Sequence, residues 1–392
     1  MTVKCLSRPV LGAALAFLTL AAPLASAETP VKPEVEASQQ QARPRIDVVF
    51  VLDTTGSMSG LLEGAKQKIF SIASRISQGR PTPQLRVGLV AYRDVGDEYV
   101  TKRFELTEDL DGIFTHLRKL QAGGGGDTPE HVGRGLGEAV SKLSWDERRE
   151  TMKLIFLVGD APPARRNDDW DFKHWAKRAA EKHIVVNTVR CGGDPATEVS
   201  WKLAAKTTDG IYESLDQSGG MVAVATPYDA ELARVNAEIA SRTVHAGKKA
   251  AREENRARAE QMASLAPEAA AERIQYMKTS RSGGGGMAAA VVASSAPVAV
   301  AGAVDLTAKP EALASVAEEE LPEELRKVAA KDREARVKQL AEERKVLEEK
   351  AAKLAAERDT WRAKNVSEKE DAFDANVMRG VKKQAAKHNL AY

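Results

Sequence analysis

The 392-residue sequence predicts an α/β fold, a doubly wound and mostly parallel sheet followed by an α-helical C-terminal region with a short coiled coil. Two continuous apolar runs, Val48–Leu52 and Leu154–Val158, are typical of strands buried on both faces. Strand-like runs alternate with amphipathic helical windows up to Leu215, a succession that favours right-handed crossovers between parallel strands. Beyond Leu215 we expect no further strands.

The overall composition excludes several classes of protein. Lys and Arg number 58 against 56 Asp and Glu, and the resulting charge of +2 is too small to attract nucleic acid, so no nucleic-acid partner is expected. A negative mean hydropathy excludes a polytopic membrane protein. Two cysteines in the whole chain exclude a fold held together by disulfides.

Residues 1–27 have the pattern of a signal peptide. Lys4 and Arg8 precede an apolar run, Val10–Ala22, and Ala25-Ser26-Ala27 follows as a small-x-small cleavage site. The run is shorter than the roughly 20 residues that a membrane-spanning helix needs, which argues against an uncleaved anchor. We therefore expect an exported protein, periplasmic or extracellular, with no transmembrane segment in the mature chain.

Composition divides the rest of the chain into five segments. Residues 28–44 are rich in Pro, Gln and Glu and are expected to be a disordered lead-in. The α/β domain is predicted over 45–225, a helical segment over 226–281, a low-complexity linker over 282–317 and a helical or coiled-coil region over 318–392. We expect strands at Ile46–Leu52, Leu85–Tyr92, Tyr99–Leu106 (an antiparallel edge strand), Lys153–Val158, Ile184–Arg190 and Ile211–Ser214, and helices at Leu61–Ser77, Leu110–Leu120, His131–Leu143, Trp170–Lys182 and Ala196–Lys206.

The C-terminal region carries a heptad pattern. Leu340, Leu347, Leu354 and Trp361 recur every seven residues, which predicts a short coiled coil that self-associates or binds a partner helix through residues 321–364. The companion positions, three residues earlier in each repeat, are Val337, Arg344, Ala351 and Arg358. Two of these are arginines, which weakens the apolar seam. The alternative is a solvated helix stabilised by surface ion pairs.

Three oxygen-rich loops are expected to meet at one edge of the sheet. The first, Asp53–Ser57, follows the first strand, and the third, Gly159–Pro163, follows the fourth. The second, Gly123–Glu130, contains four glycines that allow its backbone to approach the other loops closely. Ligands of open parallel sheets bind outside the carboxyl ends of the strands. Together the loops therefore offer two carboxylates and three hydroxyls at a predicted ligand site.

This donor set suits a hard cation. It contains neither His nor Cys, which makes zinc or copper a poor match, whereas Mg²⁺, Mn²⁺ and Ca²⁺ all accept oxygen ligands. The candidate ligands come from all three loops. They are Asp53, Thr55, Ser57, Thr128 and Asp160.

In these residues the sequence resembles the von Willebrand factor A family with its metal-ion-dependent adhesion site. The family pattern is Asp-x-Ser-x-Ser, then a Thr, then an Asp, on successive loops of a Rossmann-like sheet. Asp53, Thr55 and Ser57 match the first loop, with Thr55 in place of the first Ser, Thr128 matches the second loop and Asp160 the third. The resemblance implies an adhesion or scaffold module without enzymatic activity, whose bound metal accepts an acidic side chain from a partner protein. The tail, from Thr226 through Tyr392, looks like that of bacterial exported proteins with this domain.

Two alternatives stay open. The chain could be a structural or assembly protein that acts through its C-terminal helices, with a metal that only stabilises the loops. A haloacid-dehalogenase-like phosphatase is less favoured, because Thr55 stands where such an enzyme has its second Asp. The glycine-rich loop likewise lacks the Lys of a P-loop, since Asp127 follows the glycines.

Charged and aromatic residues near the three loops are weaker candidates for a partner-binding rim. They are Arg93, Asp94, Asp97, Asp127, Asp168, Asp169 and Trp170.

Overall fold

A computed structural model describes residues 43–126, 128–165, 169–215, 224–282, 294–366 and 372–392. The predicted signal peptide and nearly all of the predicted lead-in lie outside these residues. Residues Arg43–Tyr392 form one compact unit, so the α/β domain and the C-terminal helices belong to the same body.

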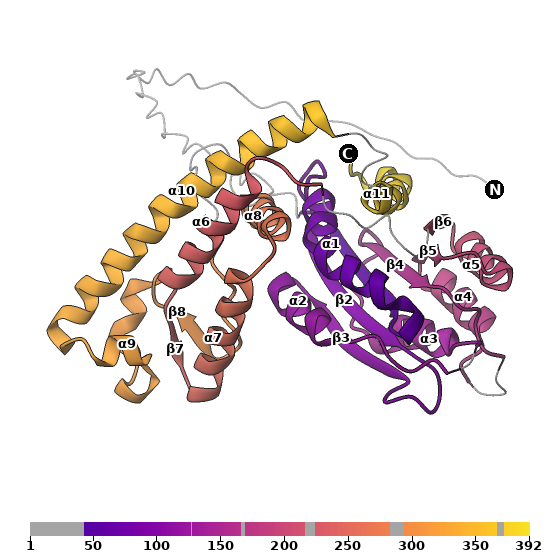
Figure 1. Ribbon diagram of the computed structural model, residues 1–392, viewed down its shortest axis with the longest axis horizontal. Coiled ribbons are helices and arrows are strands. Elements are labelled where there is room, and N and C mark those ends of the chain that lie inside the picture. Colours follow the sequence, from indigo (N-terminus) through magenta and orange to yellow (C-terminus); the bar gives the residue numbers. More distant parts are fainter. Residues whose placement is uncertain (1–42, 127, 166–168, 216–223, 283–293, 367–371) are drawn as a thin grey trace, which may run out of the picture. The chain divides into compact units, whose positions relative to one another are not determined.

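A six-stranded sheet is the centre of this body, in the order β3-β2-β1-β4-β5-β6 (Figure 1). All neighbours are parallel except β3, which pairs antiparallel with β2 at the edge. The predicted doubly wound sheet and its antiparallel edge strand are confirmed. The strands are β1 (Arg45–Asp53), β2 (Gln84–Tyr92), β3 (Thr101–Thr107), β4 (Met152–Gly159), β5 (Ile184–Cys191) and β6 (Tyr212–Leu215).

Helices cover both faces of the sheet, as the apolar strands require. Val48 and Phe50 of β1 pack into one core together with residues of α1 and α2. Val49 and Val51, which point to the other face, pack with α3, α4 and α5. These helices are α1 (Ser59–Ser77), α2 (Leu110–Lys119), α3 (Val132–Lys142), α4 (Phe172–Glu181) and α5 (Pro195–Thr207), and the 3₁₀ helix η1 (Gly56–Met58) precedes α1.

The C-terminal region is helical, with one short sheet that the sequence did not predict. Its elements are α6 (Asp229–Arg242), β7 (His245–Gly247), α7 (Lys249–Ala263), α8 (Pro267–Ser282), β8 (Ala303–Asp305), η2 (Pro310–Ser315), η3 (Glu318–Glu320), α9 (Glu323–Arg326), η4 (Ala330–Asp332), α10 (Arg333–Asn365), α11 (Ala372–Ala385) and η5 (Ala386–His388). The expectation that strands end at Leu215 is therefore wrong, because β7 and β8 pair antiparallel.

The described part of the predicted linker is packed. Ala296 and Val300 are 2% and 8% exposed, and β8 lies within the same stretch. Its Ala and Val residues resemble low-complexity sequence, but they bury apolar surface against the helices, which a solvated linker would not do. The linker prediction fails for residues 294–305.

The C-terminal helices also complete the core of the α/β domain. Tyr276 of α8 and Val377 of α11 belong to the same apolar cluster as Phe70 of α1. A buried ion pair joins the two regions as well, since Arg273 Nη2 lies 2.6 Å from Asp111 Oδ2 and the two side chains are 1% and 0% exposed. The outer side of α1 is therefore covered by the chain's own helices (Figure 1).

The heptad face of α10 packs inside the molecule. Val337 and Ala351 are fully buried, and α10 contacts α6 and α8. Arg344 forms a 2.7 Å ion pair with Asp305, and Arg358 forms a 2.6 Å ion pair with Asp229. The arginines that weaken a coiled-coil seam thus have acidic partners within the fold. Self-association through residues 321–364 stays a prediction, and in this structure the same face covers α6 and α8.

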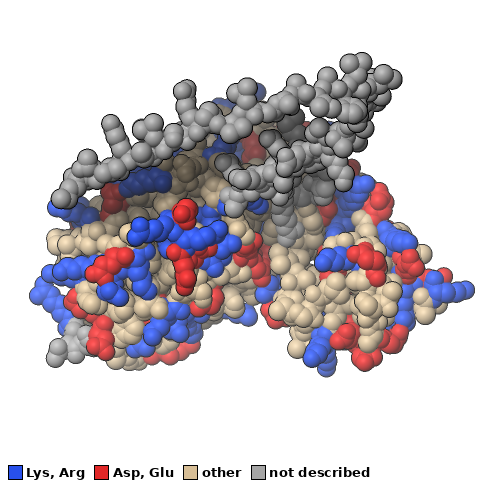
Figure 2. Space-filling model, turned by 180° about the vertical axis from the view of Figure 1, so that it is seen from behind, with Lys and Arg blue, Asp and Glu red and all other residues tan. Residues whose placement is uncertain are grey.

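Two surface properties bear on function. Figure 2 shows basic and acidic side chains interspersed over the face it presents, in keeping with the small formal charge. Among the described helices, none combines the length and the apolar composition that a membrane crossing requires.

Candidate metal centre

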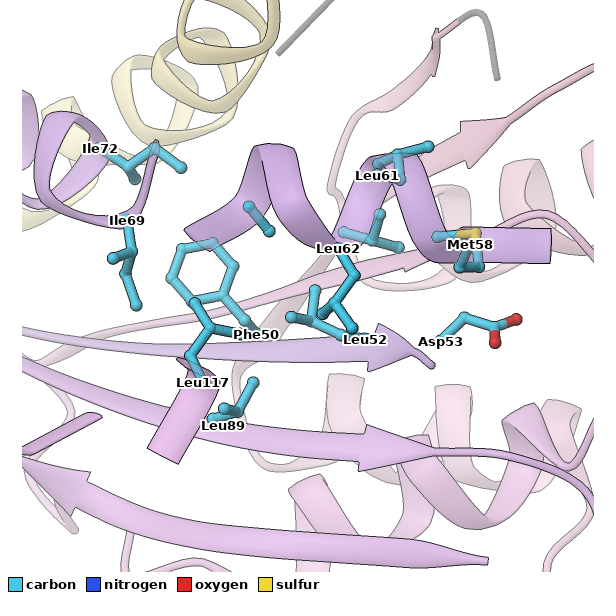
Figure 3. A pocket seen from close by; sticks show the side chains of 12 residues that line it. Phe50, Leu52, Asp53, Met58, Leu61, Leu62, Ile69, Ile72, Leu89 and Leu117 are labelled. Atoms are coloured by element: carbon cyan, nitrogen blue, oxygen red, sulfur yellow. The ribbon is translucent and has the colours of Figure 1, made fainter. Parts of the chain in front are cut away.

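Asp53 ends β1 at the carboxyl edge of the sheet, where its carboxylate extends beyond the apolar layer under α1 (Figure 3). Its Oδ1 accepts hydrogen bonds from the backbone N (2.9 Å) and Oγ1 (2.6 Å) of Thr55. The Thr55 hydroxyl in turn lies 3.4 Å from Ser57 Oγ. Three of the predicted ligands are thus in contact, and Ser57 is exposed to solvent whereas Asp53 and Thr55 are buried.

The glycine-rich loop lies directly against this first loop. Gly56 N donates to Gly124 O (3.3 Å), and Gly123 N donates to Thr54 O (3.1 Å). At Gly125, where φ is +72°, a Cβ atom would lie 2.8 Å from Thr55 Cβ. Only glycine permits this approach, because larger residues disfavour the conformation and would also meet Thr55. The glycines therefore bring the second loop against the first, Asp53–Ser57, as predicted.

The third loop joins the second through a short parallel bridge. Glu130 N donates to Pro162 O (3.1 Å), and Ala164 N donates to Glu130 O (2.7 Å). The bridge pairs Glu130 with Pro163. Thr128 lies two residues before Glu130, and Asp160 lies three residues before Pro163, so the two loops run side by side. Thr128 is exposed and Asp160 is half-buried. All three predicted loops thus meet at one edge of the sheet.

The buried carboxyl groups carry an unfavourable concentration of negative charge. Burial raises the pKa of Asp53 from 3.8 to about 7, and the charge of Asp160 adds to the increase, although hydrogen bonds from Thr55 oppose it. Asp53 Oδ2 is buried and makes no hydrogen bond of normal geometry with a described residue. An unmatched buried carboxylate oxygen of this kind is costly in the absence of a cation.

Two further residues of the site, Glu130 and Tyr92, were not among the predicted site residues. Burial raises the pKa of Glu130 to about 8, and Asp53, Asp94, Asp97 and Asp160 contribute. Its Oε2 has no hydrogen-bond partner among the described residues. The signal available in the sequence was its position two residues after Thr128.

Tyr92 is the second of these residues. It pairs with Asp53 in the parallel register of β1 and β2. Its buried hydroxyl lies close enough to Asp53 to lower the pKa of that carboxyl, although it forms no hydrogen bond of normal geometry with a described residue. A Cβ atom added to Gly159 would lie 2.3 Å from that hydroxyl and 3.3 Å from Asp53 Oδ2, so Gly159 leaves the space that the tyrosine needs. No sequence pattern indicates this role, because it depends on strand register.

The predicted rim divides into buried and exposed residues. Arg93 and Asp94 are each 5% exposed, which corrects their assignment to an exposed rim. Arg93 instead holds the loops, because its guanidinium donates to Thr54 O (3.1 Å) and Gln121 O (2.5 Å). Asp97 accepts hydrogen bonds from Gly125 N (3.2 Å) and so positions the glycine-rich loop.

The remaining rim candidates lie near the third loop. Asp169 is exposed, and Trp170 stacks on Trp175 with ring centroids 5.6 Å apart. Asp127 and Asp168 lie outside the described residues. Of the predicted rim, only Asp169 and Trp170 therefore combine a described position with accessibility beside this loop.

The residues present fit a hard divalent cation. The donor atoms are all oxygens, and several acids surround the buried Asp53 Oδ2, which has no hydrogen bond of normal geometry from a described residue. No group of three or more His, Cys, Asp or Glu side chains with metal-binding geometry occurs among the described residues. The predicted set holds only two carboxylates and otherwise consists of hydroxyls.

Comparison with known proteins identifies the domain. Residues 47–227 match the family model described as von Willebrand factor A domain. An ariadne-like RING finger protein of Acanthamoeba polyphaga mimivirus is 27% identical over 126 residues, which are 32% of this chain and 12% of that protein. The alpha-protein kinase vwkA of Dictyostelium discoideum is 24% identical over 120 residues, 30% of this chain and 18% of the kinase. The matches thus span less than a fifth of either relative.

Several solved structures are similar in fold to part of the chain. One is proximal thread matrix protein 1 from the mussel byssus, in a form with a zinc-occupied MIDAS motif. Its TM-score is 0.34 at 16% identity, and the aligned region covers 44% of this chain and 42% of that protein chain. The pilus adhesin SpaC from Lactobacillus rhamnosus GG has a TM-score of 0.36 at 16% identity, with 45% and 28% covered. On the match of the family model and on the fold described above, residues 47–227 of this chain are a von Willebrand factor A domain.

Proposed function

We propose that this chain is an exported binding protein in which Asp53, Thr55, Ser57, Thr128 and Asp160 hold a divalent cation. In this proposal Mg²⁺, or Mn²⁺ or Ca²⁺ in its place, accepts an acidic side chain of a partner protein. The observation that carries the proposal is the buried Asp53 carboxylate amid further acids, whose Oδ2 has the Tyr92 hydroxyl nearby but no hydrogen bond of normal geometry from a described residue. Export is inferred from the sequence of residues 1–27.

The protein's own residues prepare the site in two ways. Thr55 holds Asp53 Oδ1 through two hydrogen bonds, which orients the carboxylate and leaves Oδ2 available. Ser57 and Thr128 are exposed, so a partner can approach from their side. A bound divalent cation supplies positive charge and a coordination position for an outside carboxylate.

The acidic surroundings make binding depend on the metal. Without the cation, a partner's carboxylate would meet the acidic groups Asp53 and Asp160 in place of a positive charge, and like charges disfavour one another at short range. The proposal therefore requires that removal of the cation abolishes partner binding. It assigns no catalytic residue, and we propose no enzymatic activity for the chain.

Calorimetry with Mg²⁺ on the purified full chain tests the metal site. We expect one binding event in the wild type and none in Asp53→Asn or Asp160→Asn, with circular dichroism confirming that both variants are folded. Glu181→Gln is the matched control, since its carboxylate is exposed and pairs with Arg178 on the surface of α4. Unchanged Mg²⁺ binding by both site variants would refute the proposal.

Capture of partners from envelope extract tests the use of the site. We expect proteins that are retained with Mg²⁺, released by chelator and absent from the Asp53→Asn sample. Retention that is the same in chelator and in Asp53→Asn would instead favour the C-terminal helices as the contact surface. Ester hydrolysis that is lost in Asp53→Asn would favour the phosphatase alternative.

A further inference from the structure

A large polar cleft lies at the opposite end of α1 from the metal centre. It has a volume of about 1020 Å³ and lies between the C-terminal end of α1, α8, the last turns of α10, and α11. The 19 residues of α1 separate its two ends by roughly 28 Å at the usual rise of a helix. The volume is at the upper end of the range, about 300–1,000 Å³, that small-molecule sites occupy.

Basic side chains dominate the lining of this cleft. They come from three separate elements of the fold, the end of α1 with the loop after it, α10 and α11. They are Arg75, Arg80, Arg358, Arg362, Arg379 and Lys382. The acidic residues of the lining are Glu272 and Asp359. The cleft therefore has the opposite charge to the metal centre.

Acidic partners compensate only part of this positive charge. Glu272 lies 2.9 Å from Arg358 Nη1 and 3.3 Å from Arg362 Nη1, and Arg358 also pairs with Asp229 at 2.6 Å. Arg75 pairs with Asp374 at 3.3 Å. Arg379 pairs with Glu213 outside the cleft lining at 2.8 Å. Burial lowers the pKa of Arg362 and the neighbouring Arg358 lowers it further, against the opposing effect of Glu272. The wall is thus crowded with cations.

Three donor groups in this wall have no partner among the described residues. Arg358 is 1% exposed, and its buried Nη2 makes no hydrogen bond. Arg80 and Lys382 are exposed at the cleft and have no ion pair or side-chain hydrogen bond with a described residue. A buried guanidinium nitrogen without an acceptor is unusual, because buried polar groups are normally hydrogen-bonded.

We propose that this cleft binds a small multivalent oxyanion, a soluble ligand that carries two or more phosphate or carboxylate groups. Guanidinium groups present paired N–H donors that match the oxygens of phosphate and carboxylate, and such charge-assisted hydrogen bonds are the stronger class. Arg80 and Lys382 supply exposed donors at the rim, and the buried Arg358 adds fixed positive charge to the wall. The site uses none of the metal ligands and is independent of the function proposed above.

Titration calorimetry with pyrophosphate tests this proposal on the full chain, in buffer stripped of metal ions by a chelating resin and kept at constant ionic strength. We expect saturable binding to one site. The double variant Arg80→Ala/Lys382→Ala should bind at least tenfold more weakly, and it should fold normally because neither side chain has a described partner. Lys249→Ala/Lys327→Ala is the control, since it removes the same charge at positions 82% and 73% exposed and remote from the cleft.

The control distinguishes binding in the cleft from nonspecific electrostatic attraction of the anion to the protein. Binding by the control within twofold of wild type supports the proposal, whereas an equal loss in both double variants, or no saturable binding in the wild type, overturns it. Parallel titrations with citrate and inorganic phosphate identify the ligand chemistry. Tighter binding of citrate than of pyrophosphate assigns polycarboxylates, and the reverse assigns phosphates. Because no metal is present, failure here leaves the metal-centre proposal untouched.

Discussion

The two ends of α1 differ in the sign of the charge that the fold concentrates there. At its start, Asp53, Asp160 and Glu130 lie close together, and the pKa of Glu130 is raised to about 8 by burial and by the other acids. At its end, the cleft gathers six basic residues against two acidic ones. Each end has buried polar atoms without a partner among the described residues, Asp53 Oδ2 in one and Arg358 Nη2 in the other.

A third charged region shows that burial of charge alone does not indicate a ligand. Arg273 lies between Asp111, Asn236 and the backbone oxygen of Ser295, with contacts of 2.6–2.8 Å. This cation is matched by an anion and by neutral acceptors, so it has a structural role. Imbalance of charge together with an unmatched atom distinguishes the candidate ligand sites from such a structural pair.

The largest effect should come from breaking the balanced pair. Asp111→Ala leaves Arg273 buried without its anion, and we expect a loss of about 3–5 kcal/mol in the free energy of unfolding, measured by urea denaturation. Glu334→Gln, which removes an exposed pair with Lys338, should cost less than about 1 kcal/mol. Equal costs for the two substitutions would contradict the structural role of the Arg273–Asp111 pair.

The next effect concerns the unmatched carboxylate of Asp53. Because its pKa is about 7 in the folded protein against an ordinary value of 3.8, the metal-free folded state binds more protons than the unfolded state between these values. Stability should therefore fall as pH rises from about 4 to 7, by up to about 4 kcal/mol. Asp53→Asn should remove this contribution and stabilise the metal-free protein at pH 8, as measured by urea denaturation in chelator.

Asp47, on the same strand, provides a matched control of opposite sign. It is fully buried but pairs with Arg86 at 2.5 Å. Asp47→Asn should destabilise the protein at pH 8, because it removes the anion from a formed ion pair. If both Asn variants destabilise the metal-free chain, Asp53 is not an unmatched charge.

The smallest effect concerns the approach of the glycine-rich loop. Gly125→Ala places a Cβ atom 2.8 Å from Thr55 at a φ of +72°, and we expect a cost of about 1–2 kcal/mol together with weaker Mg²⁺ binding. Gly126→Ala is the control, since a Cβ atom at that position would have no neighbour within 4 Å. Thermal denaturation and Mg²⁺ titration measure both variants. Equal behaviour of the two would mean that the close approach is not needed.

Local sequence patterns were sufficient for the α/β domain and for the three loops. The continuous apolar runs of β1 and β4 required burial on both faces, and the ends of parallel strands necessarily lie at one edge of the sheet. Asp53 and Asp160 could therefore be assigned to one edge of the sheet from their positions after strands, and Thr128 from its place in the glycine-rich loop before a helix. Arg93 was misassigned, because exposure of a loop residue is not a property of local sequence.

Contacts between residues far apart in the sequence were decided by the tertiary structure alone. The roles of Tyr92 and Glu130 depend on strand register and on which side chains lose water together. Arg344 and Arg358 weakened a heptad in the sequence, but in the fold they reach Asp305 and Asp229, residues far away in the chain. Periodicity along a helix indicates which face is apolar, whereas ion pairs, shared burial and clefts arise only from the packing of distant segments. The sequence therefore determined the fold of the domain, and tertiary contacts determined its charged sites.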